Sequence, residues 1–116
     1  MELDFKTDTL RRKCETGTFF KKKNVHMNKK LIQRLTELDR APNLLDIKKQ
    51  RTLYNLHPLT GDRKYELSID IDGRKNVFRI IFETDPTEIV CDDFMNDEKF
   101  KLVTKIKILE VTDKTH

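Results

Sequence analysis

The chain has 116 residues, of which 38% are charged and 36% hydrophobic, and its 24 Lys and Arg against 20 Asp and Glu give a net charge of +4. This length suits one domain, residues 1–116, and apolar residues in periodic runs exclude a disordered chain. The charge is uneven, because residues 1–64 hold 16 basic and 8 acidic side chains whereas residues 65–116 hold 8 and 12. The electrostatic field of a basic half and an acidic half can steer a polyanion toward the protein. The alternative is an ordinary solvated surface with scattered charges.

The N-terminal segment is predicted to form a strand and then a short helix. The sequence ELDF, residues 2–5, is a candidate strand, and Asp8 is a candidate N-cap for a helix that ends before Gly17. This segment has no apolar core of a signal peptide, and no run in the chain approaches transmembrane length. Cys14 and Cys91 allow at most one disulfide and indicate no zinc site, so we expect a soluble cytosolic protein with reduced thiols.

A longer second helix is predicted from an apolar stripe with helical spacing. Asn24 or Asn28 would cap its start, and Pro42 lies just past its end. The stripe consists of Met27, Leu31, Ile32, Leu35 and Leu38. The basic side chains of the same region are expected to project away from the stripe: Lys22, Lys29, Lys30 and Arg34. Residues 42–49, PNLLDIKK, can add one helical turn.

From Leu53 onward the pattern is that of β-structure. Residues 66–71 alternate polar and apolar side chains like a half-buried strand, and Asp72-Gly73 indicates a hairpin turn. In the return strand, residues 78–82, Arg79 is expected on the face opposite Phe78, Ile80 and Phe82. EIVC and FKLVTKIKILEV are further candidate strands. The sequence therefore predicts an α+β domain, a small antiparallel sheet with two N-terminal helices on one face.

The chain lacks the sequence signatures of nucleotide-dependent and zinc-dependent enzymes, so no cofactor and no metal are expected. The remaining Arg, Lys and His residues suit metal-independent RNA cleavage. In that reaction the ribose 2′-hydroxyl attacks the adjacent phosphorus, and the enzyme supplies a base, an acid and cations for the phosphorane. Imidazole titrates near neutral pH, and guanidinium binds phosphate oxygens in pairs.

Four residues are candidates for this chemistry, and each has a structural alternative. His57 is either a site imidazole or a satisfied histidine at a strand end. Arg63 follows a tight turn and can instead be a surface arginine paired with Asp62. Arg79, between apolar residues in VFRIIF, either serves a ligand or points to solvent. His116 is either a frayed end or reaches a site at the sheet edge.

The stretch LHPLTGDRKYELSIDIDG, followed by FRIIFE, resembles the HigB branch of the RelE/ParE toxin superfamily, the plasmid-maintenance killer proteins. That family shows L-H-P-L-x-G-D-R, an alternating strand, a short turn and R-I-x-F. The order before the motif also fits, with a strand, a helix ending in ETG and a second helix ending near LD. The similarity covers residues 10–83 and implies a RelE-like fold.

The resemblance implies a toxin of a type II toxin-antitoxin system, a ribosome-dependent mRNA endonuclease (mRNA interferase) of the cytoplasm. Its partners would be the ribosome, mRNA and a HigA-type helix-turn-helix antitoxin, through which the toxin would contact operator DNA indirectly. Carried over by motif, His57 and Arg79 are expected in the catalytic site, with His116 as an acid or base. Arg63 is expected to position RNA. A basic cluster is either solvated or in contact with ribosomal RNA, and it consists of Lys22, Lys29 and Lys30.

Two other functions fit the same family. A ParE-like toxin would inhibit gyrase by binding it and would cut no RNA. A degenerate toxin would serve only as a co-repressor alongside its antitoxin. Growth arrest, transcript cleavage and DNA damage after induction distinguish the three.

Overall fold

The computed structural model describes residues 1–21, 24–74, 76–85, 89 and 91–113. The helices are α1 (Asp8–Thr16), α2 (Val25–Arg40), α3 (Leu44–Lys49), α4 (Arg51–Tyr54) and α5 (Asp97–Lys101), with 3₁₀ turns η1 (Gly61–Arg63) and η2 (Cys91–Asp93). The strands are β1 (Glu2–Phe5), β2 (His57–Pro58), β3 (Glu66–Asp70), β4 (Arg79–Thr84) and β5 (Lys105–Thr112). Among these described helices, none is long and apolar enough to cross a membrane.

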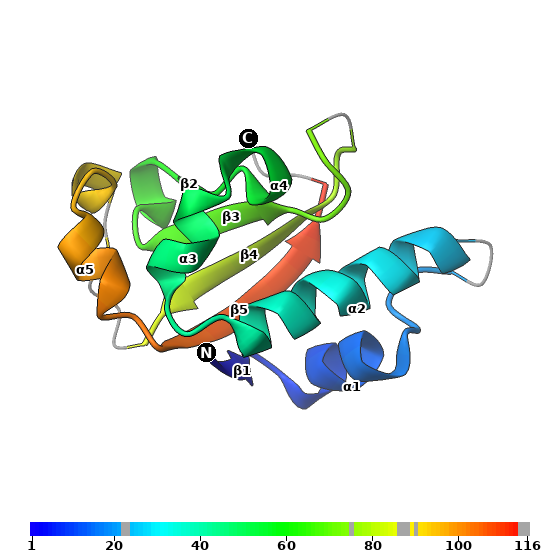
Figure 1. The fold of residues 1–116 in the computed structure, drawn as a ribbon. Coiled ribbons are helices and arrows are strands. Elements are labelled where there is room, and N and C mark those ends of the chain that lie inside the picture. Colours follow the sequence, from blue (N-terminus) through cyan, green and yellow to red (C-terminus); the bar gives the residue numbers. More distant parts are fainter. Residues whose placement is uncertain (22–23, 75, 86–88, 90, 114–116) are drawn as a thin grey trace.

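The five strands form one sheet in the order β1-β5-β4-β3-β2 (Figure 1). Strands β2 to β5 pair antiparallel with their neighbours, and β1 pairs parallel with β5. The N-terminal strand therefore lies beside the last strand at one edge of the sheet. This arrangement confirms the predicted α+β fold, with N-terminal helices and a mostly antiparallel sheet.

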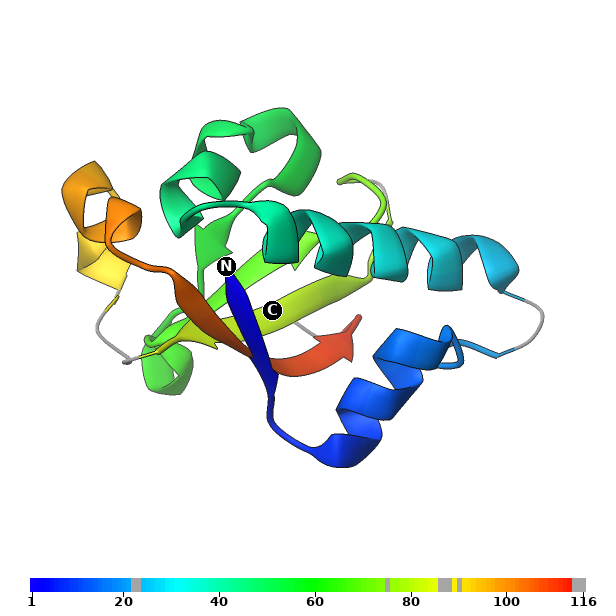
Figure 2. The ribbon, with the colours of Figure 1, turned by 60° about the horizontal axis from the view of Figure 1, so that its bottom comes forward.

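Helix α2 lies along one face of the sheet, and α1 packs beside α2 and β1 (Figure 2). The core between α2 and the sheet consists of large apolar side chains that are almost fully buried, including Leu31, Leu38, Leu67, Ile69, Ile80, Phe82, Ile106 and Ile108. Their burial removes apolar surface from water, which is the main favourable term in folding. We call this side the helix face of the sheet.

The ends of α1 follow from single residues. Thr7, rather than the predicted Asp8, is the N-cap, and its side chain accepts a hydrogen bond from the amide of Leu10. Asp8 lies in the first turn, where a negative charge suits the helix dipole. Gly17 ends the helix with φ 67°, a left-handed conformation that costs glycine little. The predicted end of this helix is confirmed.

The apolar stripe of α2 is confirmed in four of its five positions, since Ile32 is 39% exposed. The prediction that Arg34 projects away from the stripe is wrong, because its side chain is buried. Arg34 lies three residues after Leu31, on the same side of the helix. Its charge is accommodated by Glu37, at 2.8 Å, and by the ring of Tyr54 on α4, 5.5 Å from its guanidinium carbon.

The segment that follows α2 is more helical than the sequence pattern predicts. Residues 51–54 form α4, so β-structure begins only at His57. The predicted strand EIVC is not found at its described positions, where Ile89 is outside any strand and Cys91 begins η2. Helix α5 was not predicted; its cap is Asn96, which accepts from the amide of Lys99. Phe100 on α5 is fully buried, so this acidic region is anchored in the core.

A β-bulge interrupts the pairing of β4 with β5. Ile81 pairs with Glu110, whereas the next residue, Phe82, pairs with Ile108. Leu109 is therefore the extra residue on β5. Without the bulge, Glu110 would lie on the same side of the sheet as Ile108, which is the helix face. The bulge moves Glu110 to the opposite side.

Candidate functional site

The strand register brings several polar side chains to the sheet face opposite α2. Residues that are direct partners in neighbouring strands share a face, and so do residues two apart in one strand. His57 pairs with Ser68, Ser68 with Ile81, Ile81 with Glu110, and Arg79 with Asp70. We call this the far face; it includes His57, Ser68, Asp70, Arg79, Ile81 and Glu110. The two main catalytic candidates, His57 and Arg79, thus lie on one face.

His57 and Arg79 are separated by one strand. β2 and β4 flank β3, and the partners of His57 and Arg79 on β3 are two residues apart. Neighbouring strands lie about 4.8 Å apart and each residue adds about 3.4 Å, so the two Cα atoms are about 12 Å apart. Both side chains are long enough to approach a group that lies between them.

The ring of His57 is oriented by a backbone carbonyl. Its Nδ1 lies 2.8 Å from the carbonyl oxygen of Asn55. A carbonyl oxygen can only accept, so Nδ1 carries the hydrogen and the neutral ring has its lone pair on Nε2. Asn55 holds this position in a left-handed conformation, φ 47°, at the end of α4. His57 is half-buried, and its Nε2 has the chemistry of a general base.

Arg79 is fixed by a carboxylate and by the β3–β4 hairpin. Its Nε lies 2.9 Å from Oδ1 of Asp70, and one terminal nitrogen donates to the carbonyls of Asn76 and Phe78. Among the described residues, the other terminal nitrogen has only a long contact, 3.4 Å, to the carbonyl of Arg74. The side chain is 13% exposed. Arg79 does not simply point to solvent, and most of its donors are already used.

Asp70 is the deepest charged residue of this face. Its side chain is fully buried, and its Oδ2 has no hydrogen-bond partner within the described part of the chain. Its Oδ1 also receives a long hydrogen bond, 3.5 Å, from the side-chain amide of Asn55. Ser68 beside it is buried too, and its hydroxyl is likewise without a described partner. Ser68 and Asp70 are therefore buried, whereas a half-buried strand would place its polar side chains in solvent.

Arg63 joins three elements across the far face. Its guanidinium in η1 lies 2.7 Å from Glu66 on β3 and 2.5 Å from Glu110 on β5. The hydrogen bonds to Glu66 and Glu110 raise the pKa of the Arg63 guanidinium above its ordinary value. Arg63 thus pairs with Glu66 and Glu110 rather than with Asp62, the partner in the structural alternative. Between the two carboxylates runs β4, where Ile81 is fully buried outside the main core.

The charges of this cluster nearly cancel. Arg63 and Arg79 contribute +2 and Asp70, Glu66 and Glu110 contribute −3, a sum of −1. A polyanion approaching these groups meets arginines that already have carboxylate partners. Any phosphate bound here would have to compete with or bridge those ion pairs.

Two of the remaining predicted residues, Lys29 and Lys30, are not brought to the far face. Lys29 and Lys30 lie on α2, which covers the opposite side of the sheet. Lys22 and His116 lie outside the described residues. Across the part of the chain that the structure describes, no three His, Cys, Asp or Glu side chains are grouped so that they could hold a metal ion.

Cys14 is a free, buried cysteine on α1, and burial together with the charge of Glu15 raises the pKa of its thiol to about 11. The side chain of Cys91 lies outside the described part of the structure. The thiol of Cys14 is thus protonated at neutral pH and behaves as a small apolar group.

Sequence reasoning missed Asn55 and Asp70. Asn55 carries one signal, since asparagine is among the few residues that readily adopt a left-handed conformation at a helix end. Asp70 carries a weaker signal. It is a carboxylate at one of the polar positions of the alternating strand, and the other strand of the same predicted hairpin contains Arg79. A comparison with known protein families gave no matching family model, and a comparison with curated proteins gave no significant match.

Proposed function

We propose that this chain is a toxin of the HigB type that cleaves mRNA on the ribosome without a metal. The observation that carries the proposal is the shared face of His57 and Arg79, with the ring of His57 held in the tautomer that leaves Nε2 as a base. These two residues also stand at the matching positions of the toxin motif. A cognate helix-turn-helix antitoxin would neutralise the toxin and bring it to operator DNA.

In the proposed reaction, Nε2 of His57 takes the proton of the ribose 2′-hydroxyl. The 2′ oxygen forms a bond to the adjacent phosphorus, the bond from phosphorus to the 5′ oxygen breaks, and the leaving oxygen takes a proton. His116 is assigned to this second proton transfer. The products are a 2′,3′-cyclic phosphate and a 5′-hydroxyl, so no water or metal is consumed in this step.

Arg79 is assigned to the phosphate because Asp70 and the hairpin carbonyls hold its guanidinium in one orientation. Its second terminal nitrogen has a long contact, 3.4 Å, to the carbonyl of Arg74 and so has hydrogens left to donate to a phosphate oxygen. A fixed guanidinium stabilises the phosphorane charge without reorganising during the reaction.

The proposal is tested by induced expression with mapping of transcript 5′ ends. Wild-type protein should arrest growth and cut translated mRNA, and His57→Ala and Arg79→Ala should reduce cutting by about 100-fold or more. Arg74→Ala is a matched control, because the Arg74 side chain is exposed on the same hairpin. Equal arrest by wild type, His57→Ala and Arg79→Ala would show that the assigned site is wrong.

A second candidate function, a co-repressor that cuts nothing, is favoured by the paired state of Arg63 and Arg79. In that case, induction leaves growth and transcripts unchanged, while operator binding by the antitoxin still depends on this chain. Intact transcripts with broken DNA would instead indicate a gyrase inhibitor.

A further inference from the structure

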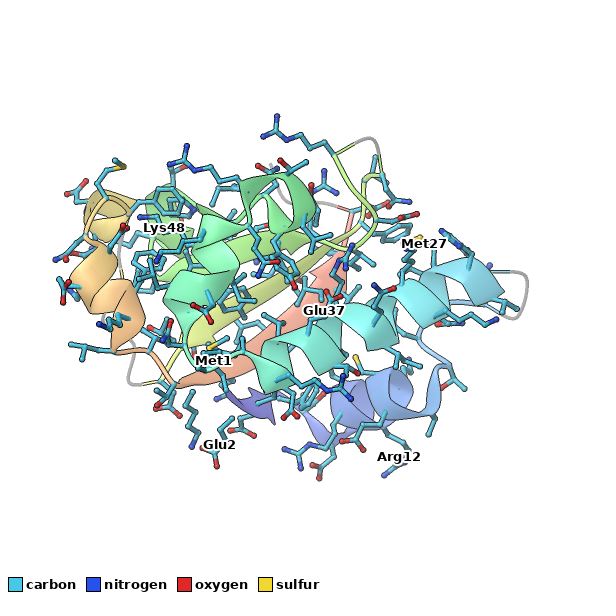
Figure 3. The ribbon with its side chains drawn as sticks, in the orientation of Figure 1. Met1, Glu2, Arg12, Met27, Glu37 and Lys48 are labelled. Atoms are coloured by element: carbon cyan, nitrogen blue, oxygen red, sulfur yellow. The ribbon has the colours of Figure 1, made fainter. Side chains whose placement is uncertain are left out.

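A second cluster of basic residues lies between α3, α4 and α5, away from the far-face cluster. It lines a cleft of about 260 Å³ that contains Leu45, Lys48, Lys49, Arg51, Met95 and Asp97. Figure 3 shows Lys48 at this end of the molecule, between α3 and α5. None of these residues belongs to the toxin motif, and α5 lies in the acidic stretch between β4 and β5.

Lys48 forms the fixed wall of the cleft. Its side chain is 9% exposed, and its ammonium nitrogen lies 4.8 Å from the ring centres of both Phe94 and Phe100. It donates to the carbonyl of Phe94 and, at 2.6 Å, to Oδ1 of Asp97. An ammonium group has three hydrogens, so one donor remains beyond these two bonds.

Lys49 and Arg51 supply positive charge that is not paired with any described carboxylate. Both side chains are exposed, and neither has a hydrogen bond or an ion pair with a described residue. They contrast with Arg63 and Arg79, which have carboxylate partners. The cleft thus holds three cations against the carboxylate of Asp97, a sum of +2.

All three cations act on the carboxylate of Asp97. The hydrogen bond from Lys48 lowers the pKa of Asp97, and the nearby charges of Lys48, Lys49 and Arg51 lower it further. A negative group at the mouth of the cleft would feel the same three cations. Beside them are two apolar groups, Leu45 and the thioether of Met95, which is 81% exposed.

We propose that this cleft binds a phosphodiester of single-stranded RNA, with the adjoining base against Met95 and Leu45. Alternating phosphates and apolar base faces match a cation pair next to an exposed apolar side chain. The inference rests on the proposed function and adds a binding site remote from the scissile link. Arg51 and His57 are six residues apart, at most about 20 Å of chain, so one RNA strand passing the β2 edge can reach both.

The test uses fluorescence anisotropy with a 2′-O-methyl RNA, which lacks the attacking hydroxyl and cannot be cleaved. The double variant Lys49→Ala/Arg51→Ala should bind about tenfold more weakly, and its slope of log affinity against log salt should be smaller by about 1.4, the value for two lost phosphate contacts. Met95→Ala should weaken binding and leave that slope unchanged. Thermal unfolding checks that these exposed substitutions leave the fold intact.

The matched control is Arg12→Ala/Lys13→Ala on α1, which removes the same charge; Figure 3 shows Arg12 far from Lys48. It should leave affinity within about twofold, since exposed charges beyond a Debye length are screened.

Equal weakening by both double variants, or no binding by the wild type, would overturn the inference. If inorganic phosphate displaces the RNA probe at concentrations similar to those at which RNA itself binds, the cleft is a site for the free ion and the RNA assignment is overturned. If RNA binding depends on Lys49 and Arg51 but induction leaves transcripts uncut, only the proposed function is contradicted. If transcripts are cut but RNA binding does not depend on these two residues, only this inference is contradicted.

Discussion

At the scale of single residues, ion pairs of very different burial occur in the same small domain. Asp70 is fully buried and Arg79 nearly so, whereas Asp4 and Arg11 on β1 and α1 form an ion pair with both side chains 43% exposed. Removing one partner of a buried pair leaves an uncompensated charge in a poorly solvated place, but removing an exposed partner leaves a charge in water. The same kind of substitution should therefore have different costs at the two sites.

We predict that Asp70→Asn and Arg79→Met each lower the free energy of unfolding by about 3 kcal/mol, and that the double variant loses less than the sum. The matched pair Asp4→Asn and Arg11→Met should each cost less than about 1 kcal/mol. Urea denaturation of the four single and two double variants gives both coupling energies. Additive losses at Asp70 and Arg79 would contradict the role given to their ion pair.

At the scale of elements, α2 is joined to α4 by a polar cluster around Glu37, which Figure 3 shows on the side of α2 that faces α4. The carboxylate accepts from Arg34 at 2.8 Å, Tyr54 at 3.0 Å and Gln33 at 3.2 Å. Burial by itself would raise the pKa of Glu37, but these hydrogen bonds together lower it below its ordinary 4.5. The charged form is thus favoured by folding.

A lowered pKa in the folded state means that stability is present above pH 4.5 and is lost as the pH falls through the folded value. We predict that Glu37→Gln lowers the unfolding free energy at pH 7 by about 2 kcal/mol, because it leaves Arg34 buried without a counter-charge. The variant should also lose less stability than wild type between pH 5 and pH 3, on the scale of about 1 kcal/mol. The measurement is the unfolding free energy from urea denaturation at each pH. Parallel curves of this free energy against pH for wild type and variant between pH 5 and pH 3 would contradict this account.

At the scale of the whole molecule, two titratable groups in the core resist ionisation. Burial raises the pKa of Cys14 to about 11 and that of Tyr54 to about 12, the latter with a further contribution from Glu37. Cys14 is on α1 and Tyr54 is on α4, so the two groups belong to different helices that pack on the same core. Both would have to lose a proton in a place that disfavours negative charge.

A raised folded pKa gives stability that is complete below the ordinary value and is lost as pH rises through the folded value. We predict that the wild-type unfolding free energy falls between pH 9 and pH 11, and that Cys14→Ala removes this part of the fall. Tyr54→Phe should remove a separate part between pH 10 and pH 12. Thermal unfolding over this range measures both, and an unchanged alkaline fall in Cys14→Ala would contradict the assignment.

Much of the fold could be predicted because its signals are local. The spacing of Met27, Leu31, Leu35 and Leu38 predicts the buried side of α2, and the alternation around Asp72-Gly73 predicts the β3–β4 hairpin. That hairpin also decides that Arg79 lies opposite Ile80 and Phe82. These patterns depend on helix and strand periods, which each segment carries within itself.

The partners of the charged residues could not be predicted in the same way. The sequence pattern places Arg34 on a polar side of the helix, but the ring that it packs against belongs to Tyr54, 20 positions later. Glu110 reaches Arg63 only because the bulge at Leu109 shifts β5 by one residue. Both outcomes depend on how segments far apart in the chain meet.

By itself, then, the amino-acid order determined the helices α1 and α2, the hairpin, and the presence of an imidazole and a guanidinium in and beside that hairpin. Only the tertiary structure decided that Asp70 is buried beneath Arg79, that Arg63 has two carboxylate partners, and that Lys49 and Arg51 have no ion pair with a described residue. The physical reason is range: periodicity acts over a few residues, whereas the field at a charge depends on every group that the folded chain brings near it.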